Sequence, residues 1–522
     1  MISPVAANES RPVEQFAHNR VAWATTPRLF WIIAVVSVLV LCQYQFWNLP
    51  SRGDRANWDY FSQVISRGGV PYRDVVNIKT PLSAYIGAAA ITLTRPFGLR
   101  EIYATRATYL LLTALTIAFT FLVASRFFNC RRVGLLAALI LLGTEQFATL
   151  NSDGVQPKTP MVLLGLISLW AALRNRPFLA GSSAMLSALS WQPGLLFFGA
   201  ACLALSRYFT GWRDRAWLRL LAGAALPLLL FLAYLWVAGA TGDFYRWCLH
   251  FNFSVYAPRE MTTAQAFTDR FSFLVEESFP QERIYFYIAA AGLLAFILRE
   301  ALLGLKAGLG ALLDRAAYHQ VAVTALVYLA FCRINMQGEQ DFIPLLPFMA
   351  IFAALILVWA IDMICALIAR TSLDSYKPRL ALITSAALFS VAAFDRASDL
   401  LAYRAPRRTL EAQDADVRAI AGRMNPGDQI FVHGRTEMLA LSGMTNSRKY
   451  TNLDHGKDNF LNQVEPGGFD GWLEQLKMDR PRVVMLSRME HVDRKQDFFD
   501  WVERDYEKVD GEVFNYYVRK GP

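Results

Sequence analysis

Charged residues are scarce in this sequence. Only 18% of its 522 residues are charged, whereas 54% are hydrophobic, with 36 phenylalanines and 13 tryptophans. A soluble chain of this length carries more charge and fewer apolar residues. The composition therefore excludes an ordinary soluble enzyme and predicts a polytopic membrane protein.

Cysteine motifs and nucleic-acid signatures are also missing. The six cysteines are scattered, with no CxxC pair, so neither a zinc site nor a disulfide framework is expected. The net charge of +9 could indicate nucleic-acid binding, but the basic residues are spread over short loops between apolar runs. This is the distribution of loops held on the cytoplasmic side of a membrane. Membrane lipids, and not nucleic acid, are the expected partners.

Apolar runs of membrane length follow one another from residue 29 to about residue 400. The polar segment 1–28 precedes the first run, which ends without a small-residue cleavage site, so we expect a retained anchor and a cytoplasmic amino terminus. Holding the basic loops in the cytoplasm gives about eleven spans. They lie near 29–47, 103–124, 133–150, 159–173, 178–192, 193–207, 217–238, 284–304, 318–334, 342–364 and 380–398. The fold class expected for residues 29–400 is an all-α polytopic membrane domain.

The composition changes after residue 400 to that of a soluble domain. Helical patterns at 411–424, 469–478 and 496–506 alternate with short strand patterns at 429–433, 482–487 and 512–519. Alternating elements predict a small α/β domain over residues 401–522. This segment contains neither a nucleophile elbow nor a phosphate-binding loop.

The expected topology places this domain outside the membrane, which we expect to be a bacterial plasma membrane. It also places there the loops 48–102 and 239–283 and the turns 151–154 and 335–341. Most acidic and aromatic polar groups that precede the domain gather in these four segments. We therefore predict that the reaction face is the outer face and that loop 48–102 is the catalytic loop.

Loop 48–102 carries the most functional groups. Trp58, Phe61 and Ile65 share one helical face, which predicts an amphipathic helix over 56–67 in the membrane interface. Asp54 directly precedes this helix. It is either the helix N-cap or a general base that acts on an incoming hydroxyl, and the sequence leaves both interpretations open.

Three other charged residues of the loop have two interpretations each. Asp59 is either a solvated residue on the helix or a second catalytic carboxylate. Asp74 is either a competing carboxylate or a turn residue. Lys79 opens a Lys-Thr-Pro-Leu helix start. It is either a lysine that snorkels to the membrane surface or a point charge for a phosphate.

Loop 48–102 contains, in order, Asp54 with an aromatic residue four positions on, Gly-x-Val-Pro-Tyr-Arg-Asp, and a Lys-x-Pro helix start. In this order the motifs resemble the first outer loop of the GT-C superfamily, the integral-membrane glycosyltransferases that use polyprenyl-phosphate sugars. The dolichyl-phosphate-mannose protein mannosyltransferase-like and aminoarabinose-transferase-like branches are the most similar. Further similarities lie at 176–194, 251–257 and 340–347.

The resemblance implies an inverting transferase that moves a sugar from a polyprenyl phosphate to a lipid, glycan or protein acceptor, without a metal or other cofactor. Asp54 falls on the family's catalytic aspartate, and Lys79, helped by Arg259 or Arg283, would hold the donor phosphate. The other expected site residues are the second carboxylates Asp59, Asp153 and Asp341 and the substrate contacts Trp58, Tyr60, Tyr72, Asn252, Tyr256 and Gln340.

Three positions depart from the family pattern. Arg55 stands where Glu or Gln is usual, Asn77 lies in a Val-Asn-Ile that replaces Trp-Asp-His, and Lys158 lies where an acidic residue is common. A non-catalytic or polymerase-type relative is therefore an alternative. From the residues alone, a transporter or lipid flippase is another, since many spans and broken helices suit it as well. Against it, the second half of the chain does not repeat the first, and few ionisable residues lie mid-span.

Overall fold

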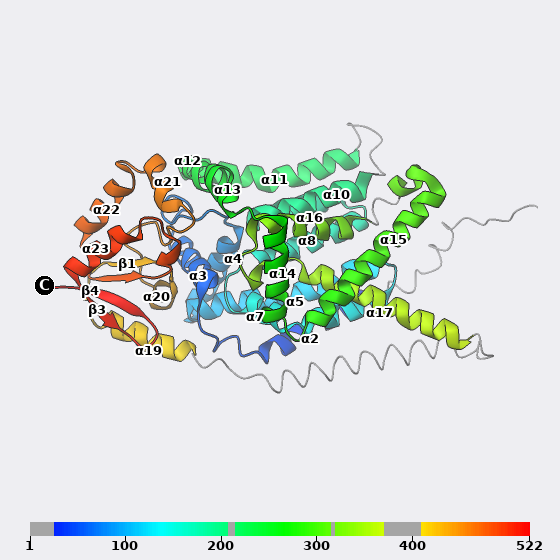
Figure 1. The fold of residues 1–522 in the computed structure, drawn as a ribbon, viewed down its shortest axis with the longest axis horizontal. Coiled ribbons are helices and arrows are strands. Elements are labelled where there is room, and N and C mark those ends of the chain that lie inside the picture. Colours follow the sequence, from blue (N-terminus) through cyan, green and yellow to red (C-terminus); the bar gives the residue numbers. More distant parts are fainter. Residues whose placement is uncertain (1–25, 207–214, 315–318, 370–408, 522) are drawn as a thin grey trace, which may run out of the picture.

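The structure is a computed structural model that describes residues 26–206, 215–314, 319–369 and 409–521. Most of segment 1–28, the span predicted at 380–398 and the domain boundary at 401 lie outside these residues. Figure 1 shows a bundle of helices with a small α/β domain at one end.

The bundle contains a helix for every predicted span that falls in the described residues. These helices are α2 (Thr26–Cys42), α5 (Glu101–Phe127), α6 (Arg131–Leu142), α7 (Glu145–Ser152), α8 (Lys158–Leu173), α9 (Pro177–Ser190), α10 (Leu196–Leu205), α11 (Arg215–Val237), α15 (Arg283–Asp314), α16 (Gln320–Asn335) and α17 (Leu346–Ala369). As predicted, the run around Pro193 is broken, and the 3-10 turn Gln192–Leu195 separates α9 from α10.

The helices differ in their ability to span a membrane. Among the described residues, α5, α11, α15 and α17 are long and apolar enough to cross a bilayer. The pair α6 and α7, bent by 67°, would add a fifth span if it is counted as one. The remaining apolar helices are shorter than the ~20 residues of an upright span. The predicted number of eleven spans is therefore not confirmed.

Loop 48–102 forms two helices, α3 (Gly53–Ser66) and α4 (Leu82–Thr94), followed by the 3-10 turn η2 (Arg95–Phe97). The amphipathic helix predicted over 56–67 is present in α3. Its apolar face does not lie in a membrane interface, because Trp58 and Phe61 are only 2% and 3% exposed and α3 packs on α4 and α20. The α/β domain covers the face that we expected lipid to cover.

Loop 239–283 is also helical. It contains α12 (Thr241–Phe244), the π-helical turns Tyr245–His250 and Asn252–Tyr256, α13 (Ala257–Glu260) and α14 (Ala264–Ser278). The turn that we expected at 335–341 ends in the short 3-10 helix η8 (Glu339–Phe342).

The carboxyl-terminal domain has a mixed four-stranded sheet. Strands β1 (Ile430–His433), β2 (Val483–Leu486), β3 (Tyr506–Asp510) and β4 (Asn515–Arg519) lie in the order β1-β2-β4-β3. β1 and β2 are parallel, with Ile430 opposite Val483, whereas β4 is antiparallel to both of its neighbours. The helices are α19 (Leu410–Ala421), α20 (Glu437–Ser442), α21 (Lys457–Val464), α22 (Gly468–Asp479) and α23 (Lys495–Asp505), with the 3-10 turn η10 (Met489–His491). The predicted α/β domain is present, although β3, which follows α23 without a break, was missed.

The domain is docked firmly on the bundle. One apolar cluster joins Trp58 and Phe61 to Met438 of α20, and another joins Trp247 to Tyr450. Burial of such side chains stabilises the contact by about 1.5–3 kcal/mol each. Hydrogen bonds add direction, since the backbone N–H of Asn446 donates to the hydroxyl of Tyr60 at 2.9 Å. The domain therefore fixes the position of α3.

Candidate active site

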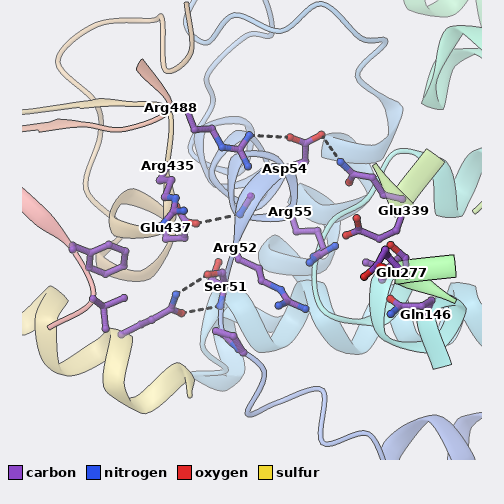
Figure 2. A pocket seen from close by; sticks show the side chains of 18 residues that line it. Ser51, Arg52, Asp54, Arg55, Gln146, Glu277, Glu339, Arg435, Glu437 and Arg488 are labelled. Carbon is purple, nitrogen blue, oxygen red and sulfur yellow. Dashed lines mark hydrogen bonds and ion pairs between the residues drawn. The ribbon is translucent and has the colours of Figure 1, made fainter. Parts of the chain in front are cut away.

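A cavity of about 680 Å³ lies between the end of the bundle and the carboxyl-terminal domain. The bundle contributes residues 50–55 at the start of α3 and side chains of α7, α14 and η8. The domain contributes side chains of α19 and α20 and of the loop after β2. Figure 2 shows that charged and amide groups from both parts face this space. The cavity is therefore suited to a polar ligand.

Asp54 is the second residue of α3 and does not cap the helix. The N-cap position is Arg52, and no side chain caps the helix start. Oδ2 of Asp54 lies 3.6 Å from Nζ of Lys79 and accepts a hydrogen bond from Gln340 at 3.5 Å. Oδ1 lies 3.7 Å from Arg488 (Figure 2). The N-cap interpretation is wrong, and the carboxylate, 30% exposed, is available to a ligand.

The neighbouring cations control the proton affinity of Asp54. Burial alone would raise the pKa of this carboxyl, but the charges of Lys79, Lys158 and Arg488 outweigh that effect and lower the pKa to about 2. Asp54 is therefore ionised at neutral pH. An anion that drew the Lys79 charge to itself would raise the pKa of Asp54 and make it a stronger base.

Lys79 approaches Asp54 from the bundle side. Its side chain is 20% exposed, and Nζ lies 5.8 Å from the centre of the Trp191 ring. Two hydrogen bonds hold the loop at Lys79. The backbone N–H of Lys79 donates to Oδ1 of Asn77, and the carbonyl of Lys79 accepts from the hydroxyl of Tyr72. Burial lowers the pKa of Lys79, and Asp54 opposes this shift. An ammonium turned toward a carboxylate does not fit a snorkelling lysine.

The two cations that depart from the family pattern each neutralise a predicted second carboxylate. Arg55 lies 2.6 Å from Asp153, and Lys158 lies 3.0 Å from Asp341, all four side chains being at most 8% exposed. Asp341 also accepts bonds from two backbone N–H groups of its own turn. Neither carboxylate is free for proton transfer. The described residues also contain no group of three His, Cys, Asp or Glu side chains placed to bind a metal ion.

Asp59, the third predicted second carboxylate, points away from the cavity. It is 2% exposed, and Oδ1 accepts a hydrogen bond from the backbone of Val155 at 3.3 Å. Burial raises its pKa to about 7, although a hydrogen bond from Thr105 and the charge of Arg106 oppose the shift. The prediction of a catalytic role is corrected accordingly, because Asp59 holds the turn after α7 instead of lining the cavity.

Three predicted substrate contacts are core residues. Trp58, Tyr60 and Tyr72 are each at most 2% exposed and pack in the clusters between bundle and domain. Two more predicted substrate contacts hold the backbone segments that carry Lys79 and Gln340. Asn252 donates to the carbonyl of Ile78, next to Lys79, and Tyr256 accepts from Gln337 in the turn before Gln340.

The predicted arginines also lie elsewhere. Arg259 pairs with Asp493 of the domain at 2.9 Å, and Arg283 is exposed at the start of α15. Neither lines the cavity. Of the predicted site residues, the structure thus brings together Asp54, Lys79 and Gln340.

The sequence analysis missed the charged residues that the domain contributes. Arg435 follows the end of β1 by two residues and Arg488 follows the end of β2 by two. Ligands often bind at the carboxyl ends of parallel strands, so charged residues in these positions were an available signal. What the sequence did not indicate is that these strand ends face Asp54.

Neither a protein-family model nor a curated protein sequence matches the chain. Its structure is similar to the crystal structure of ArnT from Cupriavidus metallidurans bound to undecaprenyl phosphate, with 13% identity, a TM-score of 0.56, and coverage of 96% of this chain and 98% of that chain. It is also similar to the archaeal oligosaccharyltransferase AglB from Archaeoglobus fulgidus in complex with an inhibitory peptide and a dolichol-phosphate, with 12% identity, a TM-score of 0.52, and coverage of 95% and 75%. Both are members of the GT-C superfamily, so the predicted GT-C-like fold is confirmed.

Proposed function

We propose that this chain is an inverting glycosyltransferase that moves a sugar from a polyprenyl phosphate to a glycan, lipid or protein acceptor at the outer face of a membrane. The observation that carries the proposal is the position of Asp54, an ionised carboxylate at the edge of a polar cavity, between Lys79 on one side and Arg488 on the other. The fold shared with ArnT and AglB, which bind polyprenyl-type phosphates, supports the donor class.

The two sides of Asp54 suit the two substrates. Lys79 does not line the cavity and approaches from the apolar bundle, where a polyprenyl chain can lie. It is the cation for the donor phosphate, and the charge of Lys158 reinforces it. The cavity on the Arg488 side opens toward the soluble domain and receives the acceptor.

The transfer step follows from this arrangement. Asp54 takes the proton of the acceptor hydroxyl, and the acceptor oxygen attacks the anomeric carbon from the face opposite the phosphate. The bond between that carbon and the phosphate oxygen breaks, and the phosphate leaves with the electron pair, its added negative charge offset by Lys79. Because the bound phosphate competes with Asp54 for Lys79, donor binding raises the pKa of Asp54 from its low value, so the base is strengthened when it is needed.

We propose that side-chain cations supply the positive charge that offsets the leaving phosphate. Lys79, Lys158 and Arg488 surround Asp54, and the carboxylates Asp153 and Asp341 are occupied by Arg55 and Lys158. The predicted second carboxylates Asp153 and Asp341 are therefore not available to a divalent cation.

Binding of undecaprenyl phosphate to the purified chain tests the role of Lys79. We expect Lys79→Ala to weaken binding at least tenfold, because truncating one partner of a desolvated charge pair costs about 2–5 kcal/mol. Lys79→Arg should lose less, since a phosphate accepts either cation. Lys477→Ala is the matched control, a lysine that pairs with Glu474 on the domain surface. If Lys79→Ala stayed within about twofold of the parent, Lys79 would not be part of the donor site.

The Asp54→Asn variant tests the base. It should abolish transfer of radiolabelled sugar from polyprenyl-phosphate donors. Donor binding should be retained or tightened, because the amide no longer competes with the phosphate for Lys79. Transfer at a rate near that of the parent would overturn the assignment of Asp54.

A further inference from the structure

Two arginines of the soluble domain are held at the edge of the cavity by the ends of parallel strands. The chain turns after β1 and β2, and the backbone N–H of Arg435 donates to Oγ of Ser487 at 2.7 Å, which ties the two turns together. Arg488 has a left-handed backbone, with φ of 54°. Such a conformation costs about 1–3 kcal/mol and persists where the surroundings impose it. The placement of these guanidinium groups is therefore built into the domain.

The arginines are not used up by partners. Arg435 is exposed and makes no side-chain ion pair with any residue in the described part of the chain. Arg488 lies 3.7 Å from Asp54, which is beyond hydrogen-bonding distance, and is 35% exposed. A guanidinium presents several N–H donors in a fixed plane, which suits carboxylate and phosphate oxygens. Both groups can thus accept an anionic ligand.

The cavity is polarised. On the domain side, Figure 2 shows two arginines, Arg435 and Arg488, against the single carboxylate Glu437, and on the bundle side it shows Glu277, Glu339 and Gln146. A ligand with an anionic group toward the domain and hydroxyl groups toward the bundle matches both walls, because ionised carboxylates accept hydrogen bonds from hydroxyls.

Buried polar atoms on the cavity wall also lack partners. Glu437 is 3% exposed and accepts a bond from the backbone of Gly53 through Oε1, while its Oε2 has no hydrogen-bond partner in the structure. Oγ of Ser51, another lining residue, is likewise buried and unpartnered. Both atoms are closed to solvent, so they make this wall polar without contacting a ligand in the open cavity.

We propose that Arg435 and Arg488 bind an oxyanion, a phosphate or a carboxylate, on the acceptor, so that this site selects acidic glycans over neutral ones. The inference rests on the proposed function, since the acceptor is the molecule whose hydroxyl Asp54 deprotonates. The donor phosphate is not the group they bind, because Lys79 reaches Asp54 from the opposite side and lies outside the cavity lining.

Direct binding of small sugars to the full chain in lipid nanodiscs tests the proposal without relying on catalysis. The probes are glucose 6-phosphate, glucuronate and glucose, measured by calorimetry. We expect at least one of the two acidic sugars to bind about tenfold more tightly than glucose, and the ratio between the acidic sugars tells which oxyanion the site prefers. If neither bound more tightly than glucose, the proposal would be wrong.

Variants then locate the binding. Arg435→Gln should reduce the affinity for the preferred acidic sugar about tenfold, and Arg435→Lys should recover part of it, since the charge remains without the planar fork. Arg418→Gln, on the outer side of α19 and away from the cavity lining, is the matched control and should change nothing. Equal affinities for Arg435→Gln and the parent would overturn the proposal.

A second ligand separates this site from the donor site. Arg435→Gln should bind undecaprenyl phosphate as the parent does, whereas Lys79→Ala should lose undecaprenyl phosphate and keep the acidic sugar. Loss of both ligands in Arg435→Gln would mean a general structural effect and would refute the inference. Because no transfer is measured, Arg435-dependent sugar binding can hold even if the proposed transferase activity fails.

Discussion

Replacing Lys158 by methionine tests whether a buried ion pair holds the turn that positions Gln340 beside Asp54. Lys158 lies 3.0 Å from Asp341, and the two side chains are only 2% and 4% exposed. Methionine has a similar length and no charge. The substitution therefore leaves the Asp341 carboxylate buried without its cation.

The expected cost follows from the surroundings of Asp341. Removing one partner of a buried ion pair costs about 3–5 kcal/mol of folding free energy. Oδ2 of Asp341 keeps the backbone N–H groups of Gln337 and Gly338, at 2.7 and 3.1 Å, so we expect the lower end of that range. In the double variant Lys158→Met with Asp341→Asn, no buried charge remains and the amide oxygen still accepts these bonds. Its cost should fall to about 1 kcal/mol.

Denaturant unfolding of the purified variants in detergent measures these free energies. Arg132→Met is the matched control, because Arg132 lies 2.8 Å from Asp362 with side chains 34% and 45% exposed. A pair so open to solvent contributes about 1 kcal/mol or less. The reasoning would be refuted if Lys158→Met cost no more than Arg132→Met, or if the double variant were as unstable as Lys158→Met alone.

Three further outcomes are expected. Cysteines placed at the exposed positions Met478 and Phe97 should react with an impermeant maleimide from the same side of the membrane and one at Arg131 from the other; labelling of Met478 and Arg131 from one side would contradict the outer-face topology. Sugar transfer should survive treatment with EDTA. Loss of transfer that a divalent metal restores would contradict the proposal that side-chain cations stabilise the leaving phosphate. Because the pKa of Asp54 in the free enzyme is about 2, the acid limb of kcat/KM should lie below pH ~4, and Lys79→Gln should move it to higher pH; an unmoved limb would show that Lys79 does not control Asp54.

The helical part of the fold could be predicted because each apolar run is a local signal. The position of Pro193 was sufficient to separate α9 from α10. The 13 residues of α4 are too few for a span, and the sequence analysis placed them in loop 48–102 without predicting the extent of the helix. What covers an apolar face is not a local property. The face with Trp58 and Phe61 is compatible with lipid or with a domain, and only the structure shows α20 against it.

The same limit applies to the charged residues of the site. Asp54 and Lys79 were found because they lie in one loop with a recognisable order. Arg55 and Lys158, taken singly, were departures from the family pattern that suggested a non-catalytic relative. Their partners Asp153 and Asp341 come from other segments, and the sequence does not indicate which cation meets which carboxylate.

The ion pairs around Asp54 are therefore more informative than any single departure. Asp54, Asp153 and Asp341 pair with Lys79, Arg55 and Lys158, so these three pairs carry no net charge, and Arg488 faces the acceptor cavity. A polyprenyl-phosphate sugar is a phosphodiester with one negative charge, and in the proposed reaction this charge competes with Asp54 for Lys79. When the sugar leaves, the phosphate gains negative charge while Asp54 becomes neutral by accepting the acceptor's proton. The loss of the Asp54 charge frees Lys79 for the leaving phosphate, so proton transfer and departure of the phosphate assist each other through one ammonium group.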